Sequence, residues 1–387
     1  MSYNMRFLAL FLVTCLLVSN VSRAQDSNHR TVEQSLELAG SNEGELKKAM
    51  AGCNGSPLEK KSILFLIQHM PEMDLKSLKS ELLISNVKLA VKARMSSAWA
   101  QRVPEEVFLN DVLPYASINE RRDSWRKDFH SRFADLVKDC KTTGEAAQEL
   151  NKHVFQVLEV KYSTKRKKPD QSPYESMETG LASCTGLSVI LTDACRSVGV
   201  PARLAGTPLW VNKRGNHTWV EVWDEGQWKF TGACEYDPGG LNRGWFQGIA
   251  SQADPKQARH RIYATSFKQT GGHFPMVWRR GSKLVPGVDV TWRYIGEPKP
   301  KAPGEYTVAI KVTDSTGKRV AVAVSVQKEG KTLFSGKSRN ESNDANDYFE
   351  VNLKPGDYKV VYEADGKSKS KEIKVLPKDG EIFKIEL

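Results

Sequence analysis

The feature that most constrains the fold is a helix followed directly by a pair of strands, between residues 183 and 234. Residues 217–223 (HTWVEVW) alternate between polar and apolar side chains, and residues 227–234 (QWKFTGAC) follow after the turn at 224–226. A helix that leads into an antiparallel hairpin predicts an α+β domain and not a parallel sheet. The helix is indicated by apolar side chains three and four residues apart, at Leu187, Ile190, Leu191, Ala194 and Val198.

The two ends of this helix are also marked in the sequence. Ser183 can cap its start, and Gly199 and Pro201 can end it. Cys184 would then occupy the first turn, where unpaired backbone amides and the helix dipole favour a thiolate and can bind an oxyanion. His217 begins the following strand, where its ring can project toward that helix end and serve as the base that a thiol nucleophile needs.

The stretch SCTGLSVILTDACRSVGVPARLAG, followed by HTWVEVWDEGQWKF, resembles the signature of the transglutaminase-like superfamily over residues 145–246. This resemblance implies a papain-like α+β core with Cys184 as nucleophile and His217 as base. It also implies thiol-dependent acyl transfer or hydrolysis on amide bonds of a protein or peptide substrate. We expect no cofactor, and no metal site, since the sequence has no CxxC pair and no cysteine and histidine at zinc-finger spacing. The matching positions are Arg196, Gly199, Pro201, Ala202 and Arg203 after the helix, and His217, Trp219 and Glu221 in the strand.

The sequence departs from the family pattern at the third catalytic position. Members usually carry an aspartate four residues after the tryptophan of the second strand, but four residues after Trp228 stands Gly232. The nearest acids are Glu235 and Asp237, and a bulge at Gly232 would bring Glu235 into register. We therefore expect Glu235 to orient His217, with Asp237 as the second candidate.

Several tryptophans and a second cysteine surround this region. Aromatic rings can wall a substrate slot and exclude water, so we expect Trp219 and Trp245 to contact the substrate. Cys195 lies on the same helix face as Cys184 three turns later, and we expect it in the core.

The N-terminus predicts export. Residues 7–18 (FLALFLVTCLLV) form an uncharged apolar run after Arg6, too short to span a bilayer, and small residues precede a cleavage site after Ala24. We expect residues 1–24 to be a secretory signal and the mature protein to be secreted or periplasmic, with no membrane span. Five cysteines would remain, an odd number, so at least one is unpaired within the chain.

Four segments follow from composition and periodicity. After the signal, residues 25–140 have helical periodicity, residues 141–296 hold the transglutaminase-like core, and residues 297–387 alternate in short strands that predict an Ig-like β-sandwich. The sandwich contains no histidine or cysteine, so we expect no chemistry there and predict that the core works without it. A linker rich in proline and glycine, residues 296–306, separates the two.

Three classes of function remain open at this point. The chain is an amide-acting cysteine enzyme, or a catalytically degenerate module that acts in binding or scaffolding, or a binder of nucleic acid or polysaccharide. The net charge of +11 favours the third class, but the lysines are scattered and the one dense run, at 165–168, lies in a polar loop. We therefore predict a protein or peptide substrate and no nucleic acid, and oligomeric state is left open.

Overall fold

The computed structural model describes residues 30–296, 302–364 and 366–387. The predicted signal at 1–24 lies outside these residues, and within them no helix is long and apolar enough to cross a membrane. Contacts along the chain divide it into two units, residues 1–81 and 82–387.

The first unit is helical, as its sequence periodicity predicts. Thr31 and Gln34 form a capping box at the first helix, and Ser56 caps a later helix that begins with Pro57. Apolar side chains such as Leu46 and Leu66 are fully buried between the helices. The helices are α2 (Val32–Ala39), α3 (Glu43–Gly52), α4 (Pro57–His69) and α5 (Glu72–Leu75), with α6 (Ser80–Met95) crossing into the second unit.

The second unit contains a five-stranded sheet in the order β5-β4-β3-β6-β7, antiparallel throughout. Its strands are β3 (Ala202–Thr207), β4 (His217–Asp224), β5 (Gln227–Thr231), β6 (Tyr263–Thr265) and β7 (Gly287–Asp289). The helices of this unit are α7 (Ala98–Gln101), α8 (Glu105–Asp111), α9 (Trp125–Phe133), α10 (Thr143–Val157), α11 (Pro173–Thr179), α12 (Cys184–Ser197) and α13 (Gln247–Ala250).

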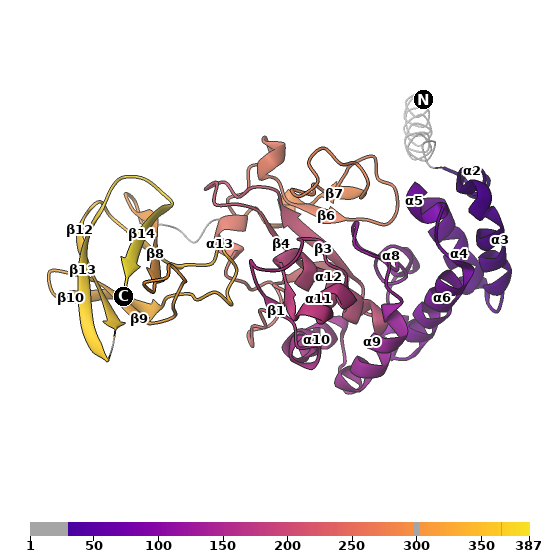
Figure 1. Ribbon diagram of the computed structural model, residues 1–387, viewed down its shortest axis with the longest axis horizontal. Helices are drawn as coiled ribbons and strands as arrows, with labels where there is room; N and C mark the ends of the chain where they lie inside the picture. The colour runs from indigo at the N-terminus through magenta and orange to yellow at the C-terminus, as the bar shows by residue number, and fades with distance from the viewer. Residues whose placement is uncertain (1–29, 297–301, 365) are drawn as a thin grey trace, which may run out of the picture. The chain divides into compact units, whose positions relative to one another are not determined.

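Strand alternation assigns the two faces of this sheet to different partners. Val220 and Val222 of β4 pack on one face of the sheet with α9, α10 and α12. Figure 1 shows β3 and β4 next to these helices. Trp219 points to the other face and packs with Phe246. The α+β class predicted from the helix and hairpin is confirmed, with α12 against β3 and β4 at its centre.

Two buried arginines fix the segment that precedes α9 against α12. Arg126 donates to the carbonyls of residues 112–114 and to that of Arg196, at 2.8–3.1 Å. Arg196 in turn donates to the carbonyls of Asp111 and Ala116. These carbonyls lie in the last turns of α8 and α12 or in the irregular segment after α8, so the two guanidinium groups satisfy backbone acceptors that have no partner within a helix.

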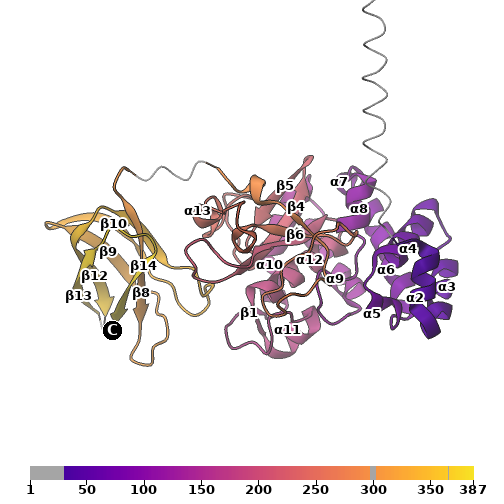
Figure 2. The ribbon, with the colours of Figure 1, turned by 90° about the horizontal axis from the view of Figure 1, so that it is seen from above.

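The C-terminal strands form two sheets that share one apolar core. One sheet has the order β10-β9-β12-β13 and the other β11-β8-β14, and Figures 1 and 2 show them as two layers. Strand β10 is exposed along its whole length, so it carries no burial periodicity. The strands are β8 (Tyr306–Thr313), β9 (Ala323–Lys328), β10 (Lys331–Lys337), β11 (Phe349–Leu353), β12 (Gly356–Ala364), β13 (Lys367–Val375) and β14 (Glu381–Glu386).

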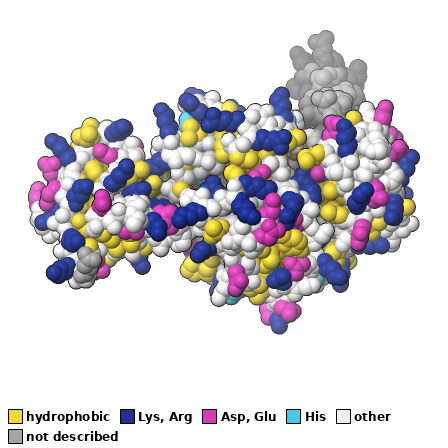
Figure 3. All heavy atoms as spheres, in the orientation of Figure 1, with side chains coloured by type: hydrophobic (Ala, Val, Ile, Leu, Met, Phe, Trp, Pro, Cys, Tyr) yellow, Lys and Arg dark blue, Asp and Glu magenta, His cyan; other side chains and the backbone are white. Residues whose placement is uncertain are grey.

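The positive charge is dispersed on the face seen in Figure 3. Lysine and arginine side chains cover all parts of that face and alternate with acidic ones. Such a surface does not form the continuous basic stripe that follows a phosphate backbone.

Candidate active site

The start of α12 holds Cys184 in a fixed position. Ser183 caps the helix as predicted, because its Oγ accepts a hydrogen bond from the Gly186 amide at 3.0 Å. The same Oγ donates to the Pro169 carbonyl at 2.6 Å, which fixes the residue before Cys184. Cys184 is partly exposed and carries a free thiol.

Hydrogen bonds from side chains of α12 connect this helix start to the first residues of strand β4. Thr185 Oγ1 donates to Thr218 Oγ1 at 3.0 Å, and Ser188 Oγ lies 3.2 Å from the Thr218 carbonyl. These bonds are buried, so they hold His217, the residue before Thr218, beside Cys184. The pair expected from the sequence is therefore brought together by contacts between its immediate neighbours.

The acid beside His217 is Asp344, from the C-terminal sandwich. His217 Nδ1 lies 3.4 Å from Asp344 Oδ2, and both side chains are almost completely buried. One ligand-type atom from each of Cys184, His217 and Asp344 lies within 4.8 Å of the others. Thiol, imidazole and carboxylate thus form one cluster. The 3.4 Å between His217 Nδ1 and Asp344 Oδ2 is the distance of an ion pair and not of a short hydrogen bond.

The electrostatics of this cluster favour a protonated imidazole. Burial lowers the pKa of His217, but the Asp344 carboxylate and Cys184 raise it further, so that pKa lies well above its usual value. Burial raises the pKa of Asp344, yet His217 and the Asn346 amide lower it overall. Both shifts favour an imidazolium next to a carboxylate.

The loop that carries Asp344, residues 338–348 between β10 and β11, is organised before any substrate arrives. The buried Arg319 guanidinium donates to the carbonyls of Asn343, Asp344 and Asp347 at 2.6–3.1 Å. Asp344 Oδ1 accepts from the Asn346 amide at 2.9 Å, which leaves Oδ2 to face His217. Asn346 Nδ2 then donates to the Asn216 carbonyl at 3.1 Å, linking the loop to the residue before His217.

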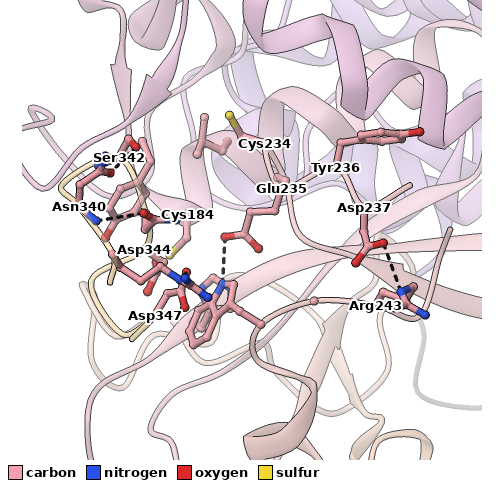
Figure 4. Close-up of a pocket in the computed structure, with 18 of the residues that line it drawn as sticks. Cys184, Cys234, Glu235, Tyr236, Asp237, Arg243, Asn340, Ser342, Asp344 and Asp347 are labelled. Atoms are coloured by element: carbon pink, nitrogen blue, oxygen red, sulfur yellow. Dashed lines mark hydrogen bonds and ion pairs between the residues drawn. The ribbon is translucent and has the colours of Figure 1, made fainter. Parts of the chain in front are cut away.

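The two acids favoured by the sequence have other partners. Glu235 Oε1 accepts a hydrogen bond from Trp245 Nε1 at 3.0 Å, and Asp237 lies 3.2 Å from Arg243. Figure 4 shows Asp237 directed to Arg243, and Asp344 on the side of Cys184. The structure thus corrects the expected third position: Asp344, and not Glu235, lies against His217 Nδ1.

The physical reason lies in the end of strand β5. The strand stops at Thr231, and a turn closed by the Glu235 amide on the Gly232 carbonyl follows in place of a bulge. Asn151 of α10 clamps this turn by donating to the Gly232 carbonyl and accepting from the Cys234 amide. A Cβ at Gly232 would lie 2.0 Å from Glu235 Oε2, so glycine makes room for the carboxyl group.

Glu235 nonetheless belongs to the same cavity. The residue as a whole is half-buried, but its Oε2 atom is buried and has no hydrogen-bond partner among the residues that the structure describes. Burial raises the pKa of Glu235 to about 7, against the opposing effect of His217. This carboxyl group therefore changes its charge close to neutral pH, and it lines the same cavity as the Cys184 thiol.

The two tryptophans expected to contact substrate have different positions. Trp245 lines the cavity, and its ring centroid lies 4.8 Å from that of His217. Trp219 is completely buried, stacks on Trp210 and donates to the Tyr294 hydroxyl at 2.8 Å. A substrate cannot reach Trp219, so its expected role is corrected to core packing, while Trp245 keeps its predicted place at the site.

Cys184 opens into a cavity of about 730 Å³ that is built from both the core and the sandwich. The core contributes Cys184, His217, Glu235 and Trp245, and the sandwich contributes the loop that carries Asp344. The sandwich therefore forms part of the cavity wall, and its Asp344 lies beside His217, although we expected no chemistry there from its sequence. Other lining residues include Tyr162, Tyr236, Arg243, Lys337, Arg339 and Asp347.

Sequence reasoning missed Asp344 because it sought the acid close to the hairpin. One signal was present: residues 338–348 (SRNESNDANDY) form a polar connection that is the longest between the described strands of the sandwich. Long ordered loops on a rigid sandwich are frequent places for functional side chains.

The same three donors could also hold a metal ion. A thiolate, an imidazole nitrogen and a carboxylate oxygen are ligands that zinc accepts, and three protein ligands suffice for a site with one open position. In the observed arrangement His217 Nδ1 lies 3.4 Å from Asp344 Oδ2, and neither ring nitrogen has a hydrogen-bond partner among the described residues.

Comparison with known proteins agrees with this geometry. Residues 131–232 match the transglutaminase-like superfamily, and no curated protein matches the chain. Among solved structures, a proposed cysteine protease from Cytophaga hutchinsonii is 17% identical with a TM-score of 0.25, over 43% of this chain and 58% of its own. A proposed protease from Parabacteroides distasonis is 7% identical with a TM-score of 0.25, over 63% of this chain and 37% of its own.

The Bacillus anthracis TIE protein is 13% identical with a TM-score of 0.18, over 49% of this chain and 30% of its own. The chain thus spans less than two thirds of each of these three proteins. The matched stretch contains the capped helix start with Cys184 and the strand that begins at His217. The stretch that carries this cysteine–histidine pair therefore matches the transglutaminase-like superfamily.

Proposed function

We propose that this protein is a thiol-dependent enzyme that cleaves or transfers acyl groups at amide bonds of a protein or peptide. The observation that carries the proposal is the cluster of the partly exposed Cys184 with the buried His217 and Asp344 in the wall of the cavity. A nucleophile, a base and an orienting acid in this order are the arrangement that acyl transfer through a covalent intermediate requires.

In the proposed reaction, the Cys184 thiolate attacks the carbonyl carbon of the amide and forms a C–S bond. The carbonyl electrons move to oxygen, and their return breaks the C–N bond. The His217 imidazolium gives its proton to the leaving amine, and Asp344 holds the ring and stabilises its charged form. Water or a second amine then attacks the thioester, with neutral His217 as base, and releases Cys184.

We also propose that the mature protein acts outside the cytoplasm, as a secreted or periplasmic enzyme. This rests on the apolar run at 7–18 and the small residues before position 25. Mass spectrometry of the protein isolated from its native host should find an N-terminus near Gln25.

The catalytic proposal is tested with a mixture of peptides, followed by mass spectrometry with and without an added primary amine. Wild-type protein should cut amide bonds or attach the amine, and Cys184→Ala should do neither. Cys140→Ser is the matched control, because Cys140 is a partly exposed thiol that does not line this cavity. Peptide binding without turnover in the wild type would support the alternative, a catalytically degenerate binding module.

A further inference from the structure

Tyr162 lies next to the nucleophile but has no part in the reaction described so far. Strand β1 (Lys161–Tyr162) pairs with β2 (Leu181–Ala182), which places Tyr162 opposite Ala182, two residues before Cys184. The Tyr162 side chain lines the same cavity as Cys184 and His217. Its hydroxyl oxygen accepts a hydrogen bond from the Ala345 amide at 2.9 Å, in the loop that carries Asp344.

This hydrogen bond leaves the hydroxyl proton available. A phenol donates one proton and accepts through its oxygen, and here the Ala345 amide occupies the accepting side. Among the residues that the structure describes, no acceptor for the Tyr162 proton is found. Burial, Asp344 and Cys184 all raise the pKa of Tyr162, so the group remains a donor across the neutral range.

The helix start supplies an incomplete set of donors for an oxyanion. The Gly186 amide donates to Ser183 Oγ, and the Leu187 amide donates to the Ser183 carbonyl at 2.9 Å. The backbone amides of Cys184 and Thr185 remain available to bind an oxyanion, and both belong to the start of α12. A tetrahedral intermediate is best stabilised by donors that converge on its oxygen from more than one element.

We infer that the Tyr162 hydroxyl is a catalytic residue that donates a hydrogen bond to the oxyanion formed during attack by Cys184. The inference rests on the proposed acyl transfer. As the C–S bond forms, the carbonyl electrons move to oxygen, and Tyr162 shares its proton with that oxygen without transferring it. When the electrons return, the leaving group departs and the Tyr162 hydroxyl is unchanged.

Two reagents separate this role from a purely structural one. Acylation of Cys184 by p-nitrophenyl acetate passes through an oxyanion, and its leaving group needs no proton. Alkylation by iodoacetamide uses the same thiolate but forms no oxyanion. The test measures both rates for wild type, Tyr162→Phe and the control Tyr263→Phe, which removes a hydroxyl that bonds to the Ala258 carbonyl outside the cavity.

Tyr162→Phe should slow acylation by roughly 10- to 1,000-fold, the range found when one oxyanion donor is removed. Its alkylation rate should stay within about twofold of wild type, and the control variant should match wild type in both reactions. An equal loss in both reactions would mean that Tyr162 only holds the Asp344 loop, and no loss in either would mean that it donates to no reacting atom. A wild-type protein that cannot be acylated would instead refute the proposed function itself.

Discussion

Asp344→Asn is the substitution whose consequence follows most directly from the structure. The asparagine keeps the shape of the side chain and removes the negative charge that lies 3.4 Å from His217 Nδ1. Without that charge the buried imidazolium loses its main stabilising partner, because burial alone lowers the pKa of His217. We expect slower acylation of Cys184 with an unchanged fold.

The size of the loss can be worked out from this geometry. Two unit charges 3.4 Å apart interact by about 5 kcal/mol at an effective dielectric constant of roughly 20. Both side chains are almost fully buried, so solvent screens them little. At about 1.4 kcal/mol per factor of ten, this corresponds to an upper limit between three and four orders of magnitude. Since the amide can still orient the ring, a smaller loss of roughly 10²- to 10³-fold is expected.

The assay is the rate of p-nitrophenolate release in the acylation step, measured beside a thermal unfolding curve. Asp347→Asn is the matched control: Asp347 lines the same cavity from the same loop, but its carboxylate pairs with Arg339 at 2.9 Å. This control should keep its rate within about threefold of wild type. A similar small effect for Asp344→Asn in a folded protein would refute the assignment of Asp344 as the residue that positions His217.

Three further predictions concern the sandwich, Glu235 and pH. A protein that ends at Gly296 lacks Asp344, so its acylation rate should fall at least as far as that of Asp344→Asn while circular dichroism shows the helices retained; full activity would show that the sandwich is dispensable. Glu235→Gln should acylate within about fivefold of wild type, but any inflection of the wild-type rate near pH 7 should vanish, since the pKa of Glu235 is raised to about 7; a loss as large as that of Asp344→Asn would restore Glu235 as the orienting acid. Because the pKa of His217 is raised, its contribution to folding stability is fully present below about pH 6.5 and is lost as the pH rises through that raised pKa. Because the pKa of Asp344 is lowered, its contribution is fully present above about pH 3.9 and is lost as the pH falls through that lowered pKa. The melting temperature of wild type should therefore exceed that of Asp344→Asn most between about pH 4 and 6.5, and a constant difference from pH 4 to 10 would contradict this linkage.

The local parts of the site could be predicted from the sequence because local interactions determine them. Ser183 caps α12 through a hydrogen bond to Gly186, three residues away, and alternation places His217 at the start of β4. The sequence also indicates that Cys195 belongs in the core, where it is fully buried. Each of these depends on spacing within one helix or one strand.

The remaining parts depend on contacts that spacing along the chain cannot reveal. Asp344 reaches His217 because Arg319 and Asn346 shape a distant loop and Asn346 bonds to Asn216. Trp219 is buried because Phe246 and Tyr294, which follow after irregular segments, cover its face of the sheet. Alternation assigns Trp219 to a face but says nothing about what lies over that face.

The most direct test of the central claim is the reactivity of individual cysteines. Iodoacetamide labelling at neutral pH, followed by peptide mapping, measures Cys184 against Cys140, Cys195 and Cys234 in one sample. Burial raises the pKa of each of these three comparison thiols, so they should react slowly. Cys184 should be labelled first and by a wide margin, and His217→Ala should remove that advantage. Equally slow labelling of all of them, unaffected by His217→Ala, would contradict the account of Cys184 as an activated nucleophile.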